Sequence, residues 1–286
     1  MLKCKKGEIK GGSYLCLLIV NALLCGGCGG EFPPRELWRA AVEVHEINIQ
    51  KELIYDNSNI GLILGMFQVE TNEIAIIGWG GSCLLSLPEN LATCKRSLAE
   101  LGVIPPISQS GSFLSGGYIQ ADFNGDGNIG RLKPVTAGFK LENTSGSEVT
   151  RTKLDRNYWF EPSVTWSQPH HILVSTDGML LVLDNHLQKI RSLSTTGIRA
   201  PLHISAGSRL DCVGRGPFVS VFVGRGGWHR SILFIHSTDE RVIYKEILLG
   251  DFKAVWPLPK KNGKFRFLLG GRGQVWEYSF RMSSCY

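Results

Sequence analysis

The stretch that decides the fold is 74–81, IAIIGWGG, which leads into a second apolar run at 83–87, CLLSL. Two short apolar runs joined by a glycine-rich turn are typical of a β-hairpin. The same unit returns three more times, at 172–178 (ILVSTDG) before 180–184, at 220–227 (SVFVGRGG) before 232–235, and at 266–271 (RFLLGG) before 274–278. A recurring hairpin indicates a repeat protein.

The spacing of these units predicts the architecture. Their starts at 74, 172, 220 and 266 are separated by 98, 48 and 46 residues, so the first gap is close to twice the others. A fifth, weaker unit is expected inside that gap, with 121–128 (ADFNGDGN) and then 137–142 (AGFKLE), its second strand decayed. A period in the forties with about four strands per unit is typical of β-propeller blades.

We therefore predict an all-β fold, a β-propeller of about five to six four-stranded blades. Residues 47–64 leave room for a partial sixth unit. A pair of β-sandwiches is the alternative, although it does not explain the even spacing. The 34 glycines fall between the apolar runs and indicate many tight turns. Only 35–47 and 90–101 have some helical character.

The N-terminus predicts export. Lys3, Lys5, Lys6 and Lys10 form a basic region before the apolar run 14–24, which is too short to span a bilayer comfortably. The following LCGGCGG, residues 24–30, resembles a bacterial lipoprotein signal, which implies acylation of Cys28. Whether Cys25 or Cys28 is processed stays open, and a short buried helix of a cytosolic protein is the alternative.

The expected domains are a signal peptide with a lipoprotein cysteine at 1–28, a linker with a short helix at 29–46, and the propeller at 47–286. The expected location is extracytoplasmic, as a bacterial cell-envelope lipoprotein or a secreted protein. Removal of residues 1–27 lowers the formal net charge from +6 to +3. Since no Lys/Arg run is longer than Lys260-Lys261, nucleic acid is not an expected partner. The membrane is expected as a partner through the lipid anchor only.

Four cysteines remain after the signal: Cys83, Cys94, Cys212 and Cys285. An even number in an exported protein permits two disulfides. Cys83 and Cys94 flank a turn at 88–90 at roughly equal distances, as partners in one hairpin would. Free buried thiols are the alternative. These four cysteines include no CxxC pair with zinc spacing.

The segment Asp122-Phe-Asn124-Gly-Asp126-Gly-Asn128 resembles an FG-GAP/VCBS-type repeat, the blade of integrin-like propellers. This resemblance implies a calcium loop, in which Asp122, Asn124, Asp126 and the backbone of Asn128 supply oxygen ligands. Gly130 stands where the family has an acidic residue, so a plain glycine turn is the alternative. The turn at 176–178 is also similar to blades of pyrroloquinoline-quinone-type propellers.

No catalytic residue is predicted, because no nucleophile, zinc or phosphate-loop motif occurs and the acidic residues cannot be paired from sequence. The Gly-Arg-Gly turns are expected to place Arg215, Arg225 and Arg272 near the ring surface, where their guanidinium groups could bind an anionic ligand. The alternative is that the three arginines occur in glycine-rich turns by coincidence. The following residues are expected to pack inside blades: Trp79, Trp228, Trp256 and Trp276.

The predicted function is an exported binding or scaffolding module for a protein or glycan partner. The alternatives are a propeller-fold hydrolase or lyase with a site at the central channel, and a degenerate fragment of a larger propeller.

Overall fold

The computed structural model describes residues 44–103, 108–109, 119–121, 123, 128–135, 138–143, 145–153, 163–167, 171–176, 179–195, 202–210, 216–224 and 230–282. Its regular elements are strands and two short 3-10 turns, η1 (Ser58–Ile60) and η2 (Ala99–Leu101). The strands are β1 (Val44–His45), β2 (Ile49–Asp56), β3 (Ile63–Glu70), β4 (Glu73–Gly78), β5 (Gly81–Ser86), β6 (Leu91–Lys95), β7 (Ser108–Gln109), β8 (Ile119–Ala121), β9 (Gly130–Val135), β10 (Gly138–Glu142), β11 (Glu148–Lys153), β12 (Ser163–Ser167), β13 (His171–Thr176), β14 (Met179–Leu183), β15 (Lys189–Ser194), β16 (Leu202–Arg209), β17 (Phe218–Gly224), β18 (Arg230–His236), β19 (Val242–Leu249), β20 (Ala254–Lys261), β21 (Lys264–Gly270) and β22 (Gln274–Phe280).

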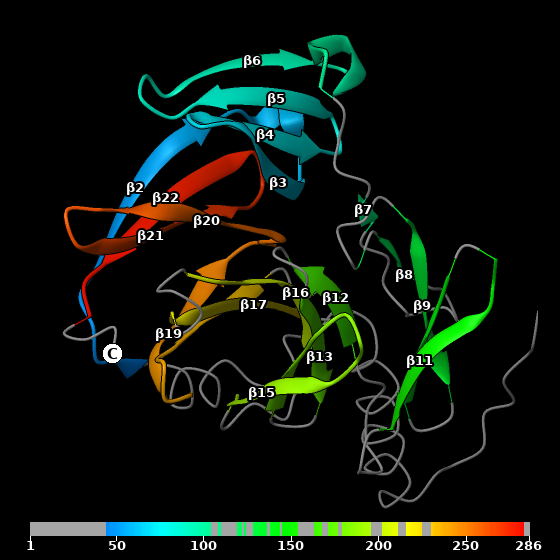
Figure 1. The fold of residues 1–286 in the computed structure, drawn as a ribbon. Helices are drawn as coiled ribbons and strands as arrows, with labels where there is room; N and C mark the ends of the chain where they lie inside the picture. The colour runs from blue at the N-terminus through cyan, green and yellow to red at the C-terminus, as the bar shows by residue number, and fades with distance from the viewer. Residues whose placement is uncertain are drawn as a thin grey trace, which may run out of the picture.

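The described strands form five antiparallel sheets (Figure 1). Sheet 1 is β3–β6, sheet 2 is β7–β11, sheet 3 is β12–β15 and sheet 4 is β16–β19, each in chain order. Sheet 5 is β20–β22, and the much earlier strand β2 completes it by pairing with β22. The two-residue strand β1 adds to sheet 4 along β19.

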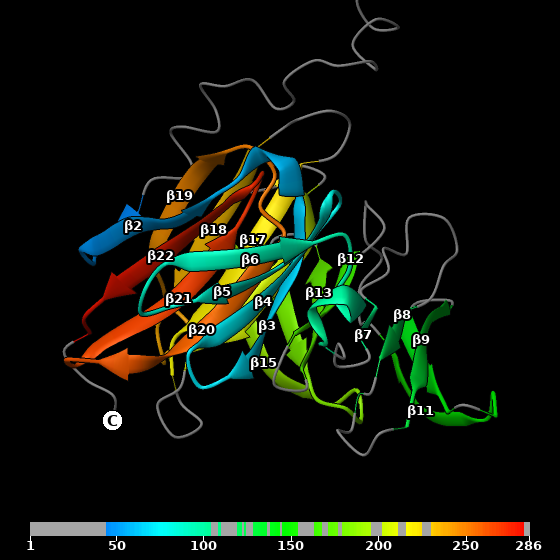
Figure 2. The ribbon, with the colours of Figure 1, turned by 90° about the horizontal axis from the view of Figure 1, so that it is seen from above.

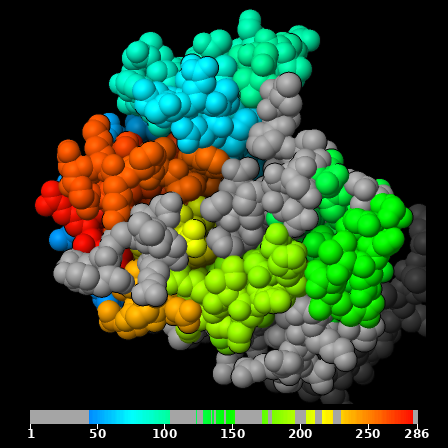
Figure 3. Space-filling view, viewed as in Figure 1, coloured from blue at the N-terminus to red at the C-terminus, as the bar shows by residue number. Residues whose placement is uncertain are grey.

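The sheets lie side by side and meet along their first strands, except that sheet 2 meets its neighbour along its second strand, β8. Strand β3 contacts β20, β20 contacts β16, β16 contacts β12, and β12 contacts β8. Figures 1 and 2 show the resulting series, with sheet 2 standing at one side, and Figure 3 shows sheet 1 lying over sheet 5. Consecutive four-stranded sheets whose first strands meet are the blades of a propeller-type fold.

The core lies between neighbouring sheets. One apolar cluster joins sheets 1 and 5 around Ile63 and Leu268, and another joins sheets 5 and 4 around Phe267 and Val221. Two further clusters join sheet 4 to sheet 3 and sheet 3 to sheet 2. A blade that is apolar on both faces is stable only between neighbours, so these boundaries hold the fold together.

The second face of sheet 1 is covered differently. Phe67 and Ala75 point to this face, where they pack against Leu98 and Val103 from the segment that follows β6. Trp256 of sheet 5 packs against the same cluster. In the described part of the chain, sheet 1 therefore shields its outer face with its own continuation.

The recurring hairpins are the two middle strands of a sheet. The units at 74, 172, 220 and 266 correspond to β4–β5, β13–β14, β17–β18 and β21–β22. In sheet 2 the middle hairpin is β9–β10, which begins at Gly130, after the Asp-rich segment. The expectation that the second strand of this unit had decayed is wrong, because β9 and β10 pair over five residues.

Two other expectations differ from the structure. Residues 90–101 have some helical character in sequence, yet they form β6 and the single turn η2. Strand β6 is an edge strand whose residues are all exposed, so pairing with β5 outweighs its helical pattern. Residues 47–64 do not form a sixth sheet, since β2 joins sheet 5 and β3 opens sheet 1. Strand β1 begins at Val44, inside the expected linker.

The β10–β11, β14–β15 and β18–β19 turns of sheets 2, 3 and 4 share one geometry. In each, the first residue's N–H donates to the carbonyl of the fifth, over Asn143–Ser147, Asp184–Gln188 and Ser237–Arg241. The fourth residue has a positive φ: 84° at Gly146, 60° at Leu187 and 68° at Glu240. Side-chain oxygens of Asn143 and Asp184 accept from backbone N–H groups in their turns, which satisfies donors that the hairpin leaves free.

The described residues include no helix with the length and apolar character required to cross a membrane.

Candidate binding site

A cleft of about 1040 Å³ opens where sheets 4 and 5 meet at their outer strands. Four segments line it: the β1–β2 connection, the β18–β19 turn, the start of β21, and the end of β22 with the residues after it. Its apolar lining, Ile47, Ile243, Phe280 and Met282, belongs to the core between the two sheets or packs against it. Its polar lining residues are Glu46, Asn48, Gln50, Ser237, Thr238, Asp239, Arg241, Lys264, Ser279 and Arg281.

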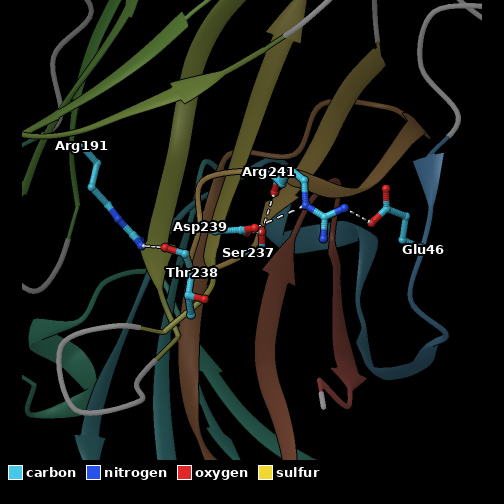
Figure 4. A network of polar contacts seen from close by, with 6 residues as sticks. All are labelled: Glu46, Arg191, Ser237, Thr238, Asp239 and Arg241. Atoms are coloured by element: carbon cyan, nitrogen blue, oxygen red, sulfur yellow. Dashed lines mark hydrogen bonds and ion pairs between the residues drawn. The ribbon is translucent and has the colours of Figure 1, made fainter. Parts of the chain in front are cut away.

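Arg241 anchors the polar wall of this cleft (Figure 4). Its Nη1 lies 3.2 Å from Oε2 of Glu46, and its Nε lies 3.4 Å from Oδ2 of Asp239. Glu46 follows β1, so Arg241 ties the N-terminal strand segment to the β18–β19 turn. Because these side chains are largely exposed, the ion pairs position groups more than they stabilise the fold.

Ser237 and Asp239 order the turn itself. The Ser237 hydroxyl donates to the Asp239 carboxylate and lies 3.0 Å from the Arg241 carbonyl. The hydrogen bond from Ser237, with the charge of Arg241, holds the pKa of Asp239 below its usual value. The cleft therefore keeps an ionised carboxylate beside a guanidinium at neutral pH.

A second arginine holds the same turn from the other side. Arg191 of β15 donates from Nη2 to the Thr238 carbonyl at 2.9 Å, and its Nε lies 3.9 Å from Oε1 of Glu240. Burial lowers the pKa of Arg191, and an arginine guanidinium remains charged in proteins. Figure 4 shows the turn between Arg191 and Arg241, so sheets 3 and 4 and the β1–β2 connection all fix its position.

Other polar groups in the cleft are available to a partner. Among the described residues, the side chains of Arg281 and Asn48 have no hydrogen-bond or ion-pair partner. Lys264 donates from Nζ to Oε1 of Gln50 and retains two donors. Ten of the fourteen lining residues are polar, a larger share than in a typical small-molecule pocket.

Directly behind the turn, His236 is fully buried. Its Nε2 lies 2.9 Å from the Ser194 carbonyl, and its Nδ1 has no hydrogen-bond partner within the described ranges. Burial lowers its pKa from 6.5 to about 4, and the positive charges of Arg191 and Lys245 act in the same direction. The imidazole is therefore neutral at physiological pH and supports the wall of the cleft.

The structure brings one predicted cysteine pair together. Cys83 and Cys94 form a disulfide between β5 and β6, where the two residues are direct partners across the strands. Cys212, Cys285 and the lipidation candidate Cys28 lie outside the described residues. The second disulfide and the lipid anchor stay predictions.

Of the four calcium-ligand candidates, only Asn128 is described. It is exposed and lies two residues before β9, whereas Asp122, Asn124 and Asp126 lie outside the described residues. The described part of the chain contains no group of three or more His, Cys, Asp or Glu residues arranged to hold a metal. The calcium loop stays a prediction.

The tryptophans divide into two kinds. Trp256 and Trp276 pack against apolar clusters as expected, and Trp228 lies outside the described residues. Trp79 does not pack, because 74% of its surface is exposed on the β4–β5 turn. Of the three Gly-Arg-Gly arginines, Arg272 is described and exposed, while Arg215 and Arg225 are outside the described part.

Sequence reasoning missed the cleft because its lining comes from segments nearly two hundred residues apart in the chain. Glu46 and Arg241 carry no motif, and only the pairing of β1 with β19 brings them together. The repeated five-residue turn was a usable signal, since each copy begins with Asn, Asp or Ser, residues that favour turns.

No protein-family model matches the sequence, and no curated protein matches it. Among solved structures, the chain is similar to virginiamycin B lyase from Staphylococcus aureus, with 8% identity, 82% of this chain and 99% of that chain covered, and a TM-score of 0.47. It is also similar to a putative gluconolactonase, with 11% identity, 83% and 94% coverage, and a TM-score of 0.45. A third similar structure is the extracellular domain of a putative hybrid two-component system from B. thetaiotaomicron, with 14% identity, 75% and 27% coverage, and a TM-score of 0.36. Similarities at this level carry no argument about activity or partners.

Proposed function

We propose that the chain is an exported five-bladed propeller that acts as a binding module and recognises its partner, a protein or a glycan, at the cleft between sheets 4 and 5. The blades are the five sheets, and β2 closes the last of them by pairing with β22. In this proposal the propeller is a scaffold, and the segments at one of its ends form the recognition surface.

The observation that carries the proposal is the construction of the cleft wall. Arg241 is fixed between Glu46 and Asp239, and Arg191 fixes the same turn from sheet 3. A wall held from three directions is pre-organised, so little conformational entropy is lost when a partner binds. Arg281 and Asn48 then supply hydrogen-bonding groups that have no role inside the described part of the fold.

Export is supported by the basic and apolar N-terminus and by the Cys83–Cys94 disulfide, a bond that persists in oxidising compartments.

We propose acylation of Cys28 as the anchor and calcium at Asp122–Asn128 as a brace of one blade. Labelling with a fatty-acid analogue tests the anchor: the label is expected on the full chain and absent from Cys28→Ser. A label that persists in Cys28→Ser contradicts that assignment.

Binding at the cleft is tested with Arg281→Glu, because this exposed side chain supports no other described residue. The full chain, purified in detergent, is immobilised and exposed to a cell-envelope extract, and a captured partner is identified by mass spectrometry and re-measured in pure form. Charge reversal at a rim position is expected to weaken binding about ten-fold, or about 1.4 kcal/mol.

The matched control is Lys189→Glu, which reverses the charge of an exposed side chain at the start of β15, away from the cleft lining. We expect this variant to bind like the unchanged protein. Equal binding by Arg281→Glu and Lys189→Glu, or no specific capture by the unchanged protein, would overturn the assignment of the cleft.

A further inference from the structure

Three turns are joined by backbone hydrogen bonds at the opposite end of β2 from the cleft. They are the β2–β3 connection (57–63), the β4–β5 turn (78–81) and the β21–β22 turn (271–273), which we call the three-turn platform. The N–H of Asn57 donates to the Gly273 carbonyl at 2.8 Å, and the N–H of Gly273 donates to the Gly61 carbonyl at 2.7 Å. Sheets 5 and 1 are thus fastened together through their main chains.

The β4–β5 turn joins the platform in the same manner. The N–H of Trp79 donates to the Leu62 carbonyl at 3.1 Å, and the N–H of Gly80 donates to the Ile60 carbonyl at 2.9 Å. Leu62 also forms a bridge with Arg272 on its other side. Leu62 therefore lies between Trp79 and Arg272. The backbones of these two residues are about two strand spacings apart, roughly 10 Å.

Glycines make this close approach feasible. A Cβ at Gly80 would lie 2.1 Å from the Asn59 carbonyl oxygen, and one at Gly78 would lie 2.4 Å from that of Ile60. At Gly273, where φ is +67°, a Cβ would lie 2.6 Å from the Asn57 carbonyl oxygen. The glycine-rich turns of the repeat are thus packed against other backbone, which makes the platform rigid.

On this rigid base, two large side chains face solvent. Trp79 is 74% exposed, although burial of an indole is strongly favourable. Arg272 is exposed, and its guanidinium has no partner among the described residues. Between and beside them lie the exposed Ser58 and Asn59, whose side chains are also unpartnered in the described part of the chain.

We propose that the three-turn platform is a second binding site, which takes an acidic saccharide: one sugar ring stacks on the indole of Trp79, and the carboxylate of a uronic acid unit pairs with Arg272. The site is separate from the cleft of the proposed function, and it lies on other turns.

A saccharide fits these groups better than a protein does. A stable protein interface buries about 800 Å² on each side around an apolar centre. Among the described residues of the platform, Trp79 is the one large apolar side chain that is exposed. A pyranose needs one flat apolar surface for its C–H face and hydrogen-bonding groups for its hydroxyls, which Trp79, Ser58 and Asn59 present. The planar fork of a guanidinium matches a carboxylate in geometry and charge.

The test measures binding of a short oligogalacturonate and of a neutral oligogalactoside of equal length to the full chain, by calorimetry and by tryptophan fluorescence, in a buffer with chelator. Trp79→Ala is expected to weaken both sugars at least ten-fold. Arg272→Gln is expected to weaken the oligogalacturonate about ten-fold and to leave the neutral sugar unchanged. Because both side chains are exposed, thermal melts are expected to show that both variants fold.

Leu249→Ala is the matched control, since Leu249 is 80% exposed at the end of β19, outside the platform. It is expected to bind both sugars like the unchanged protein. The proposal is overturned when the unchanged protein binds neither sugar, or when Trp79→Ala binds them equally well. A protein ligand that depends on Trp79, with no sugar bound, also overturns it.

Discussion

The hydroxyl of Tyr55 lies 3.1 Å from Sγ of Cys83, although Tyr55 belongs to β2 of sheet 5 and Cys83 to β5 of sheet 1. It also lies 3.4 Å from Sγ of Cys94, the disulfide partner on β6. Cys83 is buried, whereas Cys94 sits on the fully exposed edge strand. The disulfide thus connects an exposed strand to the packed boundary between two sheets.

Replacement of this disulfide is expected to lower the stability of the fold. In a Cys83→Ala/Cys94→Ala variant, loss of the crosslink over a sequence separation of 11 residues is expected to cost about 3 kcal/mol. For a protein of this size, that corresponds to a fall in Tm of roughly 6 to 12 °C. Reductant is expected to lower the Tm of the unchanged protein similarly and to leave that of the variant unaffected. Equal melts for both proteins without reductant would refute the expectation.

His236 is expected to make stability depend on pH. Its pKa is about 4 in the fold and near 6.5 when unfolded, so the unfolded chain binds more protons between these values. The free energy of unfolding is therefore expected to fall as the pH drops from about 6.5 to about 4, by up to about 3 kcal/mol. Denaturant unfolding at several pH values measures this slope.

His236→Gln is expected to flatten the slope in that window, whatever its effect on stability at neutral pH. The control is His186→Gln, at an exposed histidine in the β14–β15 turn, which is expected to retain the slope of the unchanged protein. A slope that His236→Gln leaves unaltered would assign the pH dependence to other groups.

The platform glycines predict a contrast between two similar substitutions. Gly80→Ala is expected to destabilise the protein by about 1 to 3 kcal/mol, because its Cβ would lie 2.1 Å from a backbone oxygen that the hydrogen bonds hold in place. Gly65→Ala is expected to be nearly neutral, since its Cβ would be 3.9 Å from Cδ1 of Ile77, an ordinary contact. Thermal melts compare the two, and equal effects would argue against a rigid platform.

The repeated five-residue turn predicts a stabilising change. Glu240 adopts φ of 68° where the equivalent turn of sheet 2 has Gly146, and a left-handed conformation costs a non-glycine residue about 1 to 2 kcal/mol. Glu240→Gly is expected to stabilise the protein by about 1 kcal/mol, because Glu240 is exposed and its 3.9 Å contact with Arg191 is long, so the contact contributes little. Gly146→Ala is expected to destabilise it by a similar amount. Chemical denaturation of both variants checks the signs.

The calcium loop is tested by thermal unfolding of the full chain with excess calcium and with excess chelator. At about 100 times Kd, a ligand of the native state adds about 2.7 kcal/mol, so a clear rise in Tm is expected. Asp126→Asn removes one proposed ligand charge and is expected to abolish most of that rise. Identical melts with calcium and chelator would leave 122–128 as a turn without metal.

The middle hairpins of the sheets could be read from the sequence, because their strands are buried on both faces and form continuous apolar runs. Edge strands could not be read in this way. All residues of β6 are exposed, and without knowledge of its partner strand its sequence has some helical character. The completion of sheet 5 by β2 depends on a pairing over more than two hundred residues, which no local pattern encodes.

The candidate sites were predicted less well than the fold, for the same reason. Trp79 was expected inside a blade because tryptophans usually are, yet the glycines around it place the ring on a turn that the described sheets leave uncovered. The pairing of Cys83 with Cys94 was accessible, because both lie in one hairpin at equal distances from its turn. The Glu46–Arg241 contact needed tertiary structure.

The pairing of β2 with β22 also fixes an order of assembly. A ribosome makes residues 49–56 more than two hundred residues before residues 274–280, so β2 has to wait for β22 before it can complete sheet 5. During that wait its backbone groups form an unpaired edge, open to association with other nascent chains. Until β22 has been made, only shielding of that edge prevents such association, and a chain that terminates before β22 has no strand with which to pair it.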